Sequence, residues 1–82
     1  MSAGKFKVSY PAIVQVALLA APEKAALTKL FSSSELDQPT VTRPAGEGRF
    51  VSRLGEKRVL WRRTERRKPE ILSIVDKSYA QA

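Results

Sequence analysis

Basic side chains are concentrated in one stretch of the sequence, "KRVLWRRTERRK", which covers residues 57 to 68. Seven of the fifteen lysines and arginines lie within these twelve residues, where like charges repel one another. Such a stretch can be a solvated surface, a phosphate-binding surface, or the part of an active site that stabilises negative charge. After residue 41 the chain has eight arginines and three lysines. Because the planar guanidinium of arginine matches the geometry of phosphate and carboxylate groups, the residue types favour binding of an anion.

The charge is unevenly distributed along the chain. Residues 1 to 41 contain four cations and three anions, whereas residues 42 to 82 contain eleven cations and five anions. The second half therefore has +6 of the net charge of +7. This asymmetry indicates a nucleic acid, an anionic membrane or an acidic protein as partner, and does not choose among them. The chain has no cysteine and no histidine, which excludes disulfides, thiolate chemistry, a Ser-His triad and zinc held by these ligands. We therefore expect no metal and no cofactor.

The length of 82 residues predicts a single domain over residues 1–82. The uncharged stretch "VSYPAIVQVALLAAP" resembles the core of a secretory signal, but Tyr10, Pro11 and Gln15 interrupt it. It also falls short of the ~20 apolar residues that a membrane-spanning helix needs. We therefore expect a cytoplasmic protein that does not enter a membrane.

The pattern of apolar residues predicts a strand, two helices and then three strands. Residues 5–10 alternate between polar and apolar side chains, as in a strand that buries Phe6, Val8 and Tyr10. Pro11 and Pro22 are suited to the first turns of two successive helices. The first runs through residues 12–20 and is apolar enough to be well buried, with Ile13 packed against the sheet. The second helix has three apolar residues on one face, Leu27, Leu30 and Phe31.

Residues 38–48, "QPTVTRPAGEG", are predicted to form a surface loop, because they contain two prolines and two glycines. The following segments, "RFVSRL" and "KRVLWRRT", flank Gly55-Glu56, and a glycine in the first position of a two-residue connection predicts a tight hairpin turn. A last strand over residues 70–76 is apolar on both faces, as expected inside a sheet. The predicted fold class is α+β, with a helical hairpin packed on a small antiparallel sheet of four strands in the order β-α-α-β-β-β.

The hairpin turn fixes which side chains share a face of the sheet. With Gly55 and Glu56 in the turn, one face has the apolar residues Phe50, Leu54, Val59 and Trp61. The other has four arginines around Val51 and Leu60, namely Arg49, Arg53, Arg58 and Arg62. Arginines directly opposite each other repel, so this face needs a counter-charge. The alternative is a solvated face, with Glu47, Glu56 and Glu65 as counter-charges.

The order of elements and the run "GRFVSRLGEKRVLWRR…EILSIVDKSY" resemble the RelE/ParE superfamily of bacterial toxins. Members have a helical hairpin on a small antiparallel sheet, with a basic strand, a turn, and then an arginine followed by aliphatic residues and an aromatic one. That last element is "KRVLW" in this chain. The resemblance implies either a RelE-like endoribonuclease that cuts mRNA on the ribosome without a metal, or a ParE-like inhibitor of DNA gyrase. Both kinds are held inactive by an antitoxin, which we expect to be acidic.

The resemblance also implies roles for particular residues. It places Arg58 at the arginine beside the scissile phosphate, Arg49 at a basic strand position, and Tyr79 at the late tyrosine of the family. With histidine absent, the proton acceptor would be Glu47, Tyr79 or a lysine. The residues expected to bind RNA are Arg53, Arg62, Lys57 and Lys77. A small basic RNA-binding module without toxicity is a further alternative.

Overall fold

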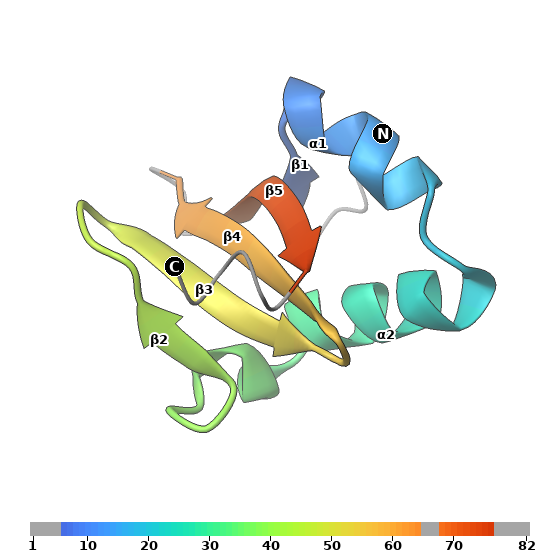
Figure 1. The fold of residues 1–82 in the computed structure, drawn as a ribbon. Helices are drawn as coiled ribbons and strands as arrows, with labels where there is room; N and C mark the ends of the chain where they lie inside the picture. Colours follow the sequence, from blue (N-terminus) through green and yellow to red (C-terminus); the bar gives the residue numbers. More distant parts are fainter. Residues whose placement is uncertain (1–5, 65–67, 77–82) are drawn as a thin grey trace.

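The computed structural model describes residues 6–64 and 68–76. Its strands form one five-stranded sheet in the order β1-β5-β4-β3-β2. The helices are α1 (Tyr10–Ala17) and α2 (Ala21–Phe31), followed by a short 3-10 helix, η1 (Ser34–Asp37). The strands are β1 (Lys7–Val8), β2 (Thr42–Pro44), β3 (Arg49–Leu54), β4 (Lys57–Arg63) and β5 (Pro69–Asp76). Figure 1 shows α1 beside β1 and β5, and β2 at the opposite edge of the sheet. The α+β class and two helices packed on a sheet are confirmed.

The hairpin of β3 and β4 has the predicted register. Arg53 lies opposite Arg58, Phe50 opposite Trp61 and Arg49 opposite Arg62. Gly55, in the turn, has a φ of 59°, the sign that a glycine-first two-residue turn requires. The assignment of the two faces of the hairpin is therefore confirmed.

The sheet differs from the prediction at both of its edges. β2 lies within the predicted loop and pairs with β3, placing Arg43 opposite Val51. β1 is only two residues long and pairs with β5 in parallel, so the sheet is mixed. The prediction of four antiparallel strands was wrong in these two respects. The three residues of β2 give almost no periodic signal, and the alternation at residues 5–10 does not tell in which direction that strand pairs.

The core lies between the helices and one face of the sheet. Trp61, which is 1% exposed, stacks on Phe50 with ring centroids 4.7 Å apart and meets the edge of Phe31 at 5.8 Å. Its indole N–H donates to the buried hydroxyl of Ser52 at 2.7 Å. Leu27 and Phe31 are buried as predicted, and Leu30 and Phe50 are half-buried against the core.

Helix α1 is much less buried than its composition predicts. Within the helix only Ala12 is fully buried, whereas Tyr10 is 89% and Ile13 42% exposed, so the predicted burial of Tyr10 and Ile13 was wrong. The helix has about two turns and lies beside β5, where one narrow face is enough to cover the sheet. Tyr10 begins this helix rather than ending the first strand. No helix in the described part of the chain is long and apolar enough to span a membrane.

A bulge in β5 determines which of its side chains enter the core. Trp61 lies opposite Ile71 and Val59 opposite Ile74, with the register shift between Leu60 and Trp61. Residues three apart in a regular strand would point to opposite faces. Because the bulge adds one residue, Ile71 and Ile74 are both buried on the helix side.

Candidate anion-binding face

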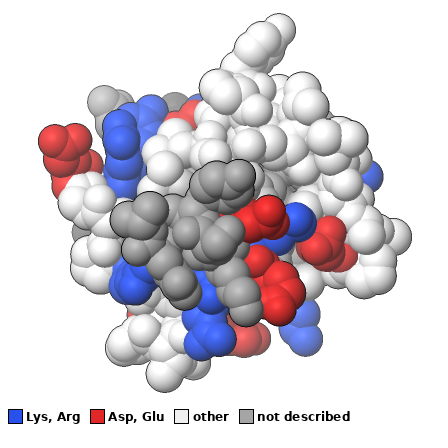
Figure 2. Space-filling view, viewed as in Figure 1, with Lys and Arg blue, Asp and Glu red and all other residues white. Residues whose placement is uncertain are grey.

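The face of the sheet opposite the helices contains five arginines, which we call the arginine face: Arg43 of β2, Arg49 and Arg53 of β3, and Arg58 and Arg62 of β4. Side chains of directly opposed residues lie on the same face of an antiparallel pair. Val51 and Leu60 form the apolar centre between the arginine pairs. Figure 2, drawn from the same side as Figure 1, shows Lys and Arg atoms over the region of β2 and β3.

The two ends of the arginine face differ in their electrostatics. Four residues along a strand span about 13 Å, which separates the Arg49–Arg62 pair from the Arg53–Arg58 pair. Arg62 donates from Nε to Glu70 Oε1 at 2.8 Å, so a carboxylate partly neutralises that end. Glu47 is close to the same end, in the connection between β2 and β3, where it has a φ of 52°. The Arg49–Arg62 end is therefore mixed in charge.

The other end is a hollow with basic walls. A cavity of about 220 Å³ is lined by three arginines from three strands, Arg43, Arg53 and Arg58, together with Val51 and residues 39–42. Arg58 is half-buried and donates from Nη1 to the carbonyl oxygens of Lys57 at 2.8 Å and Gly55 at 3.2 Å. These bonds hold its guanidinium beside the turn. None of the described residues that line this cavity is acidic.

Arg43 was not among the residues predicted to bind a ligand. Its segment was predicted to be a loop, because it lies between Pro39 and Pro44 and two glycines follow. The signal that was present is "TVT", residues 40–42, a run of β-branched residues that favours a strand. The pairing of β2 with β3 brings Arg43 to the arginine face.

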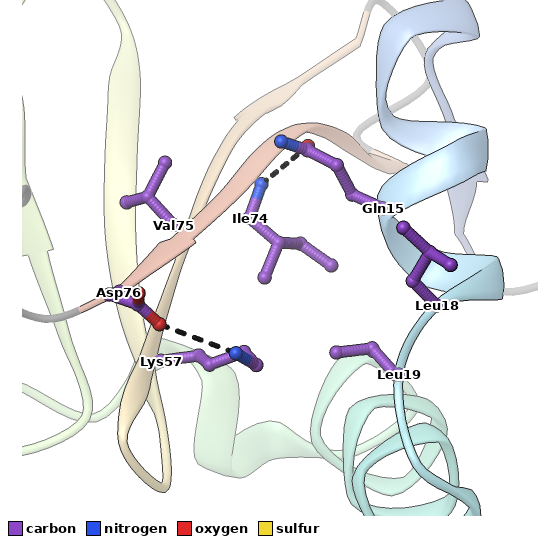
Figure 3. Close-up of a pocket in the computed structure, with 7 residues that line it drawn as sticks. All are labelled: Gln15, Leu18, Leu19, Lys57, Ile74, Val75 and Asp76. Carbon is purple, nitrogen blue, oxygen red and sulfur yellow. Dashed lines mark hydrogen bonds and ion pairs between the residues drawn. The ribbon is translucent and has the colours of Figure 1, made fainter.

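Lys57 lies away from the arginine face. Its Nζ is 3.3 Å from Asp76 Oδ1, beside a second hollow of about 370 Å³ between α1 and β5 (Figure 3). Leu18, Leu19 and Ile74 form apolar walls of this hollow. Gln15 reaches across from α1 and accepts the N–H of Ile74 at 2.9 Å through Oε1 (Figure 3). Lys57 is thus an ion-paired residue at the helix side of the sheet.

The structure brings together only some of the residues that were predicted from the sequence to form the site. Arg53 adjoins Arg58, and Arg49 adjoins Arg62, but Glu47 is at the opposite end of the hairpin from Arg58. Tyr79 and Lys77 lie outside the described residues. Within the described residues, no group of three or more His, Cys, Asp or Glu side chains could hold a metal ion.

A scan of protein-family models and a search of curated proteins gave no match to this sequence. A search of solved structures identified a similar fold. The chain is similar to a chain in the crystal structure of the toxin–antitoxin complex RelBE2 from Mycobacterium tuberculosis, with a TM-score of 0.65. The alignment covers 89% of this chain and 99% of that chain, at 20% sequence identity. The RelE-like fold expected from the sequence resemblance is therefore the fold of this protein.

Proposed function

We propose that this protein is the toxin of a toxin–antitoxin pair and that it acts on RNA through the arginine face, as a RelE-like, metal-independent endoribonuclease. The observation that carries the proposal is the placement of five arginines on the sheet face opposite the helices, in a chain with a RelE-like fold. Arginine forks pair with phosphate oxygens in two parallel hydrogen bonds. An RNA strand supplies the counter-charge that opposed arginine pairs need.

In cleavage of this kind the ribose 2′-hydroxyl gives its proton to a base and attacks the adjacent phosphate, while the bond from phosphorus to the 5′-oxygen of the next nucleotide breaks and an acid protonates that oxygen. The products are a 2′,3′-cyclic phosphate and a 5′-hydroxyl, and negative charge develops on the phosphoryl oxygens in between. A guanidinium held in place before the reaction stabilises that charge without reorganising. The hydrogen bonds from Arg58 to two backbone carbonyls support this role for Arg58, because they restrain its guanidinium. Arg49 and Arg53 then bind flanking phosphates, and Tyr79 and Glu47 are the candidate proton-transfer groups. Such a toxin would act in the cytoplasm, where the ribosomes are.

The test is cleavage of mRNA on programmed ribosomes with EDTA present. We expect Arg58→Ala to lower the cleavage rate by about 100-fold or more, as for removal of a group that contacts developing charge. Tyr79→Phe tests the proton-transfer role. Lys24→Ala, which removes one exposed cation from α2 on the other side of the sheet, is the matched control and is expected to cleave like the wild type. If Arg58→Ala and Lys24→Ala cleave equally well, Arg58 has no catalytic role.

A second candidate function is a toxin that binds its target without cleaving it, as a ParE-like gyrase inhibitor does. The observation that favours it is the distance of Glu47 from Arg58 along the hairpin, which leaves that carboxylate away from the fixed guanidinium. Absence of cleavage by the wild type, with and without ribosomes, combined with inhibition of gyrase-dependent supercoiling, would select this alternative.

We also propose that an acidic antitoxin covers the arginine face when the protein is inactive. Opposite potentials across an interface accelerate association and select the partner. Expression of the chain alone is expected to stop growth, and co-expression of its antitoxin is expected to restore it. Unimpaired growth and translation during strong expression of the chain alone would contradict the toxin proposal.

A further inference from the structure

We propose that the outer face of helix α1 is a dimerisation surface, on which the α1 helix of a second copy of this chain packs. The apolar residues of this face are spaced three and four apart, and we call them the α1 stripe: Tyr10, Ile13, Val14, Ala17 and Leu18. All five are exposed, Val14 to 63% and Leu18 to 79%. The proposal does not depend on the activity toward RNA, because the arginine face belongs to β2, β3 and β4.

Helix α1 is apolar on two opposite sides, and only one of them is covered by the rest of the chain. Ala12 is buried, and Val16 packs against the core on the same side. Because an α-helix has about 3.6 residues per turn, Tyr10, Val14 and Leu18 point away from that side. The N–H of Leu18 donates to the carbonyl oxygen of Val14 at 3.1 Å, so the helical spacing continues as far as Leu18. A helix that is apolar all round is normally buried on all sides, which indicates a further layer over the stripe.

The spacing of the stripe identifies a helix as the element that covers it. Apolar side chains three and four residues apart form a ridge, and such ridges pack into the grooves of a neighbouring helix. The hollow between α1 and β5 adjoins this ridge, since Leu18 belongs to the stripe and also lines the hollow with Leu19 and Ile74 (Figure 3). A helix that lies on the stripe can place one of its side chains there.

The lack of charge on this surface selects a second copy as the partner. Residues 8–22, which include the whole stripe, contain no charged side chain, and the region of α1 is white in Figure 2. Among the described residues that line the hollow, Lys57 and Asp76 are charged, and these two pair with each other at 3.3 Å. The proposed RNA target and the proposed acidic antitoxin are polyanions, which are attracted to the arginine face instead. A second copy offers an equally uncharged, apolar stripe.

The position of α1 allows two copies to approach although each has a net charge of +7. Figure 1 shows α1 beside β1 and β5, whereas β2 is at the opposite edge of the sheet. Contact through α1 therefore leaves the arginines of β2 and β3 away from the interface. Like charges on the two copies then repel only weakly across solvent that contains salt.

Two-fold symmetry, the commonest arrangement of identical chains, places the centre of such a surface against itself. Val14 is the central residue of the stripe, four positions from both Tyr10 and Leu18. In the dimer Val14 therefore faces Val14 of the second copy, and Tyr10 lies against Leu18 of the second copy. A stripe of five residues is small beside the roughly 20–30 residues that each partner contributes to a standard interface. We expect a weak dimer, with a dissociation constant on the order of 10 µM or above.

The first experiment is analytical ultracentrifugation of the full chain, made by cell-free synthesis to avoid toxicity, from about 1 µM to about 1 mM. Val14→Glu and Val14→Lys are each expected to weaken association by about 100-fold or more, because two like charges would meet at the centre of the interface. A mixture of the two variants should associate at least about 10-fold more tightly than either alone, since opposite charges then meet. Thr28→Glu, at an exposed position of α2, is the matched control and should associate like the wild type.

The second experiment uses the absence of cysteine from the sequence. The axes of packed helices are about 8–10 Å apart, so the two facing Cα atoms at position 14 come within disulfide reach. Val14→Cys should form a covalent dimer under mild oxidation at a rate about 10-fold or more above that of the control Thr28→Cys, which reacts only by chance collision. Thermal unfolding of each variant checks that the fold is intact, as expected for substitutions of exposed side chains.

The outcomes are independent of the proposed activity. A wild-type chain that stays monomeric up to about 1 mM overturns the proposal, even if it cleaves RNA. So does a Val14→Cys variant that cross-links no faster than Thr28→Cys. If the wild type is monomeric and Val14→Glu also escapes neutralisation by the antitoxin, the stripe is an antitoxin surface and the second copy is the wrong occupant. If the chain dimerises through the stripe but neither binds nor cleaves RNA, the dimer stands and the proposed function fails.

Discussion

Trp61 is the residue on which most of the core depends. It is fully buried, stacks on Phe50, meets the edge of Phe31 and donates a hydrogen bond to Ser52. Ser52 is itself fully buried and hydrogen-bonded to Thr42 of β2, so the indole is connected through two hydroxyls to the edge strand. A substitution of Trp61 therefore also disturbs the hydrogen bonds that connect the core to β2, the strand that contains Arg43.

We predict that Trp61→Ala lowers the free energy of unfolding by about 3–5 kcal/mol, the range for truncating a large buried aromatic side chain. Urea denaturation measures this loss. Trp61→Phe is the control, because it keeps a ring against Phe31 and Phe50 but leaves Ser52 without its N–H donor. Its loss should be smaller than that of the alanine variant. A loss below about 1 kcal/mol for Trp61→Ala would contradict the burial described for this side chain.

Among the elements, the β3–β4 hairpin determines the geometry of the arginine face through its turn. We predict that Gly55→Ala destabilises the protein by about 1 kcal/mol or more, because alanine is strained at a φ of 59°. A Cβ added at this position meets no heavy atom within 4 Å, so the loss comes from the backbone conformation alone. Gly55→Asn, which tolerates positive φ better, should lose less. Thermal unfolding that is identical for wild type and Gly55→Ala would refute this account.

The sequence was sufficient to predict this hairpin, because a two-residue turn fixes the register of both strands at once. Local information also predicted where both helices begin, because each has a proline in its first turn. It predicted a strand that contains β1, but not its parallel pairing with β5 at the other end of the chain. It could not predict β2, which has only three residues and is ordered by its pairing with β3. Arg43 was missed for that reason, and the bulge that turns both Ile71 and Ile74 inward was missed because it depends on the pairing of β4 with β5.

At the scale of the whole molecule, the net charge of +7 is concentrated in the second half of the chain and supplies the arginine face. We predict that affinity for single-stranded RNA falls with salt concentration and that Arg49→Ala lowers the slope of log K against log salt by about 0.7. Arg62→Ala should lower it less, since Glu70 already pairs with that guanidinium. Anisotropy titrations at several salt concentrations measure both slopes, with Lys24→Ala as the control outside the face. A larger change for Arg62→Ala than for Arg49→Ala would show that the ion pair with Glu70 opens on binding.

The position of β5 in the sheet has a consequence for the order in which the protein is made. β5 is the last strand of the described chain to leave the ribosome, yet it lies between β1 and β4. Its pairing with the N-terminal segment joins Ser9 to Leu72, which are 63 residues apart. A nascent chain that has reached only β4 can form the basic hairpin, but both edges that β5 will occupy are still open and Trp61 lacks its neighbour Ile71. The hairpin arginines can therefore come together before β5 completes the sheet. A partner that binds those arginines can reach them while synthesis is still in progress.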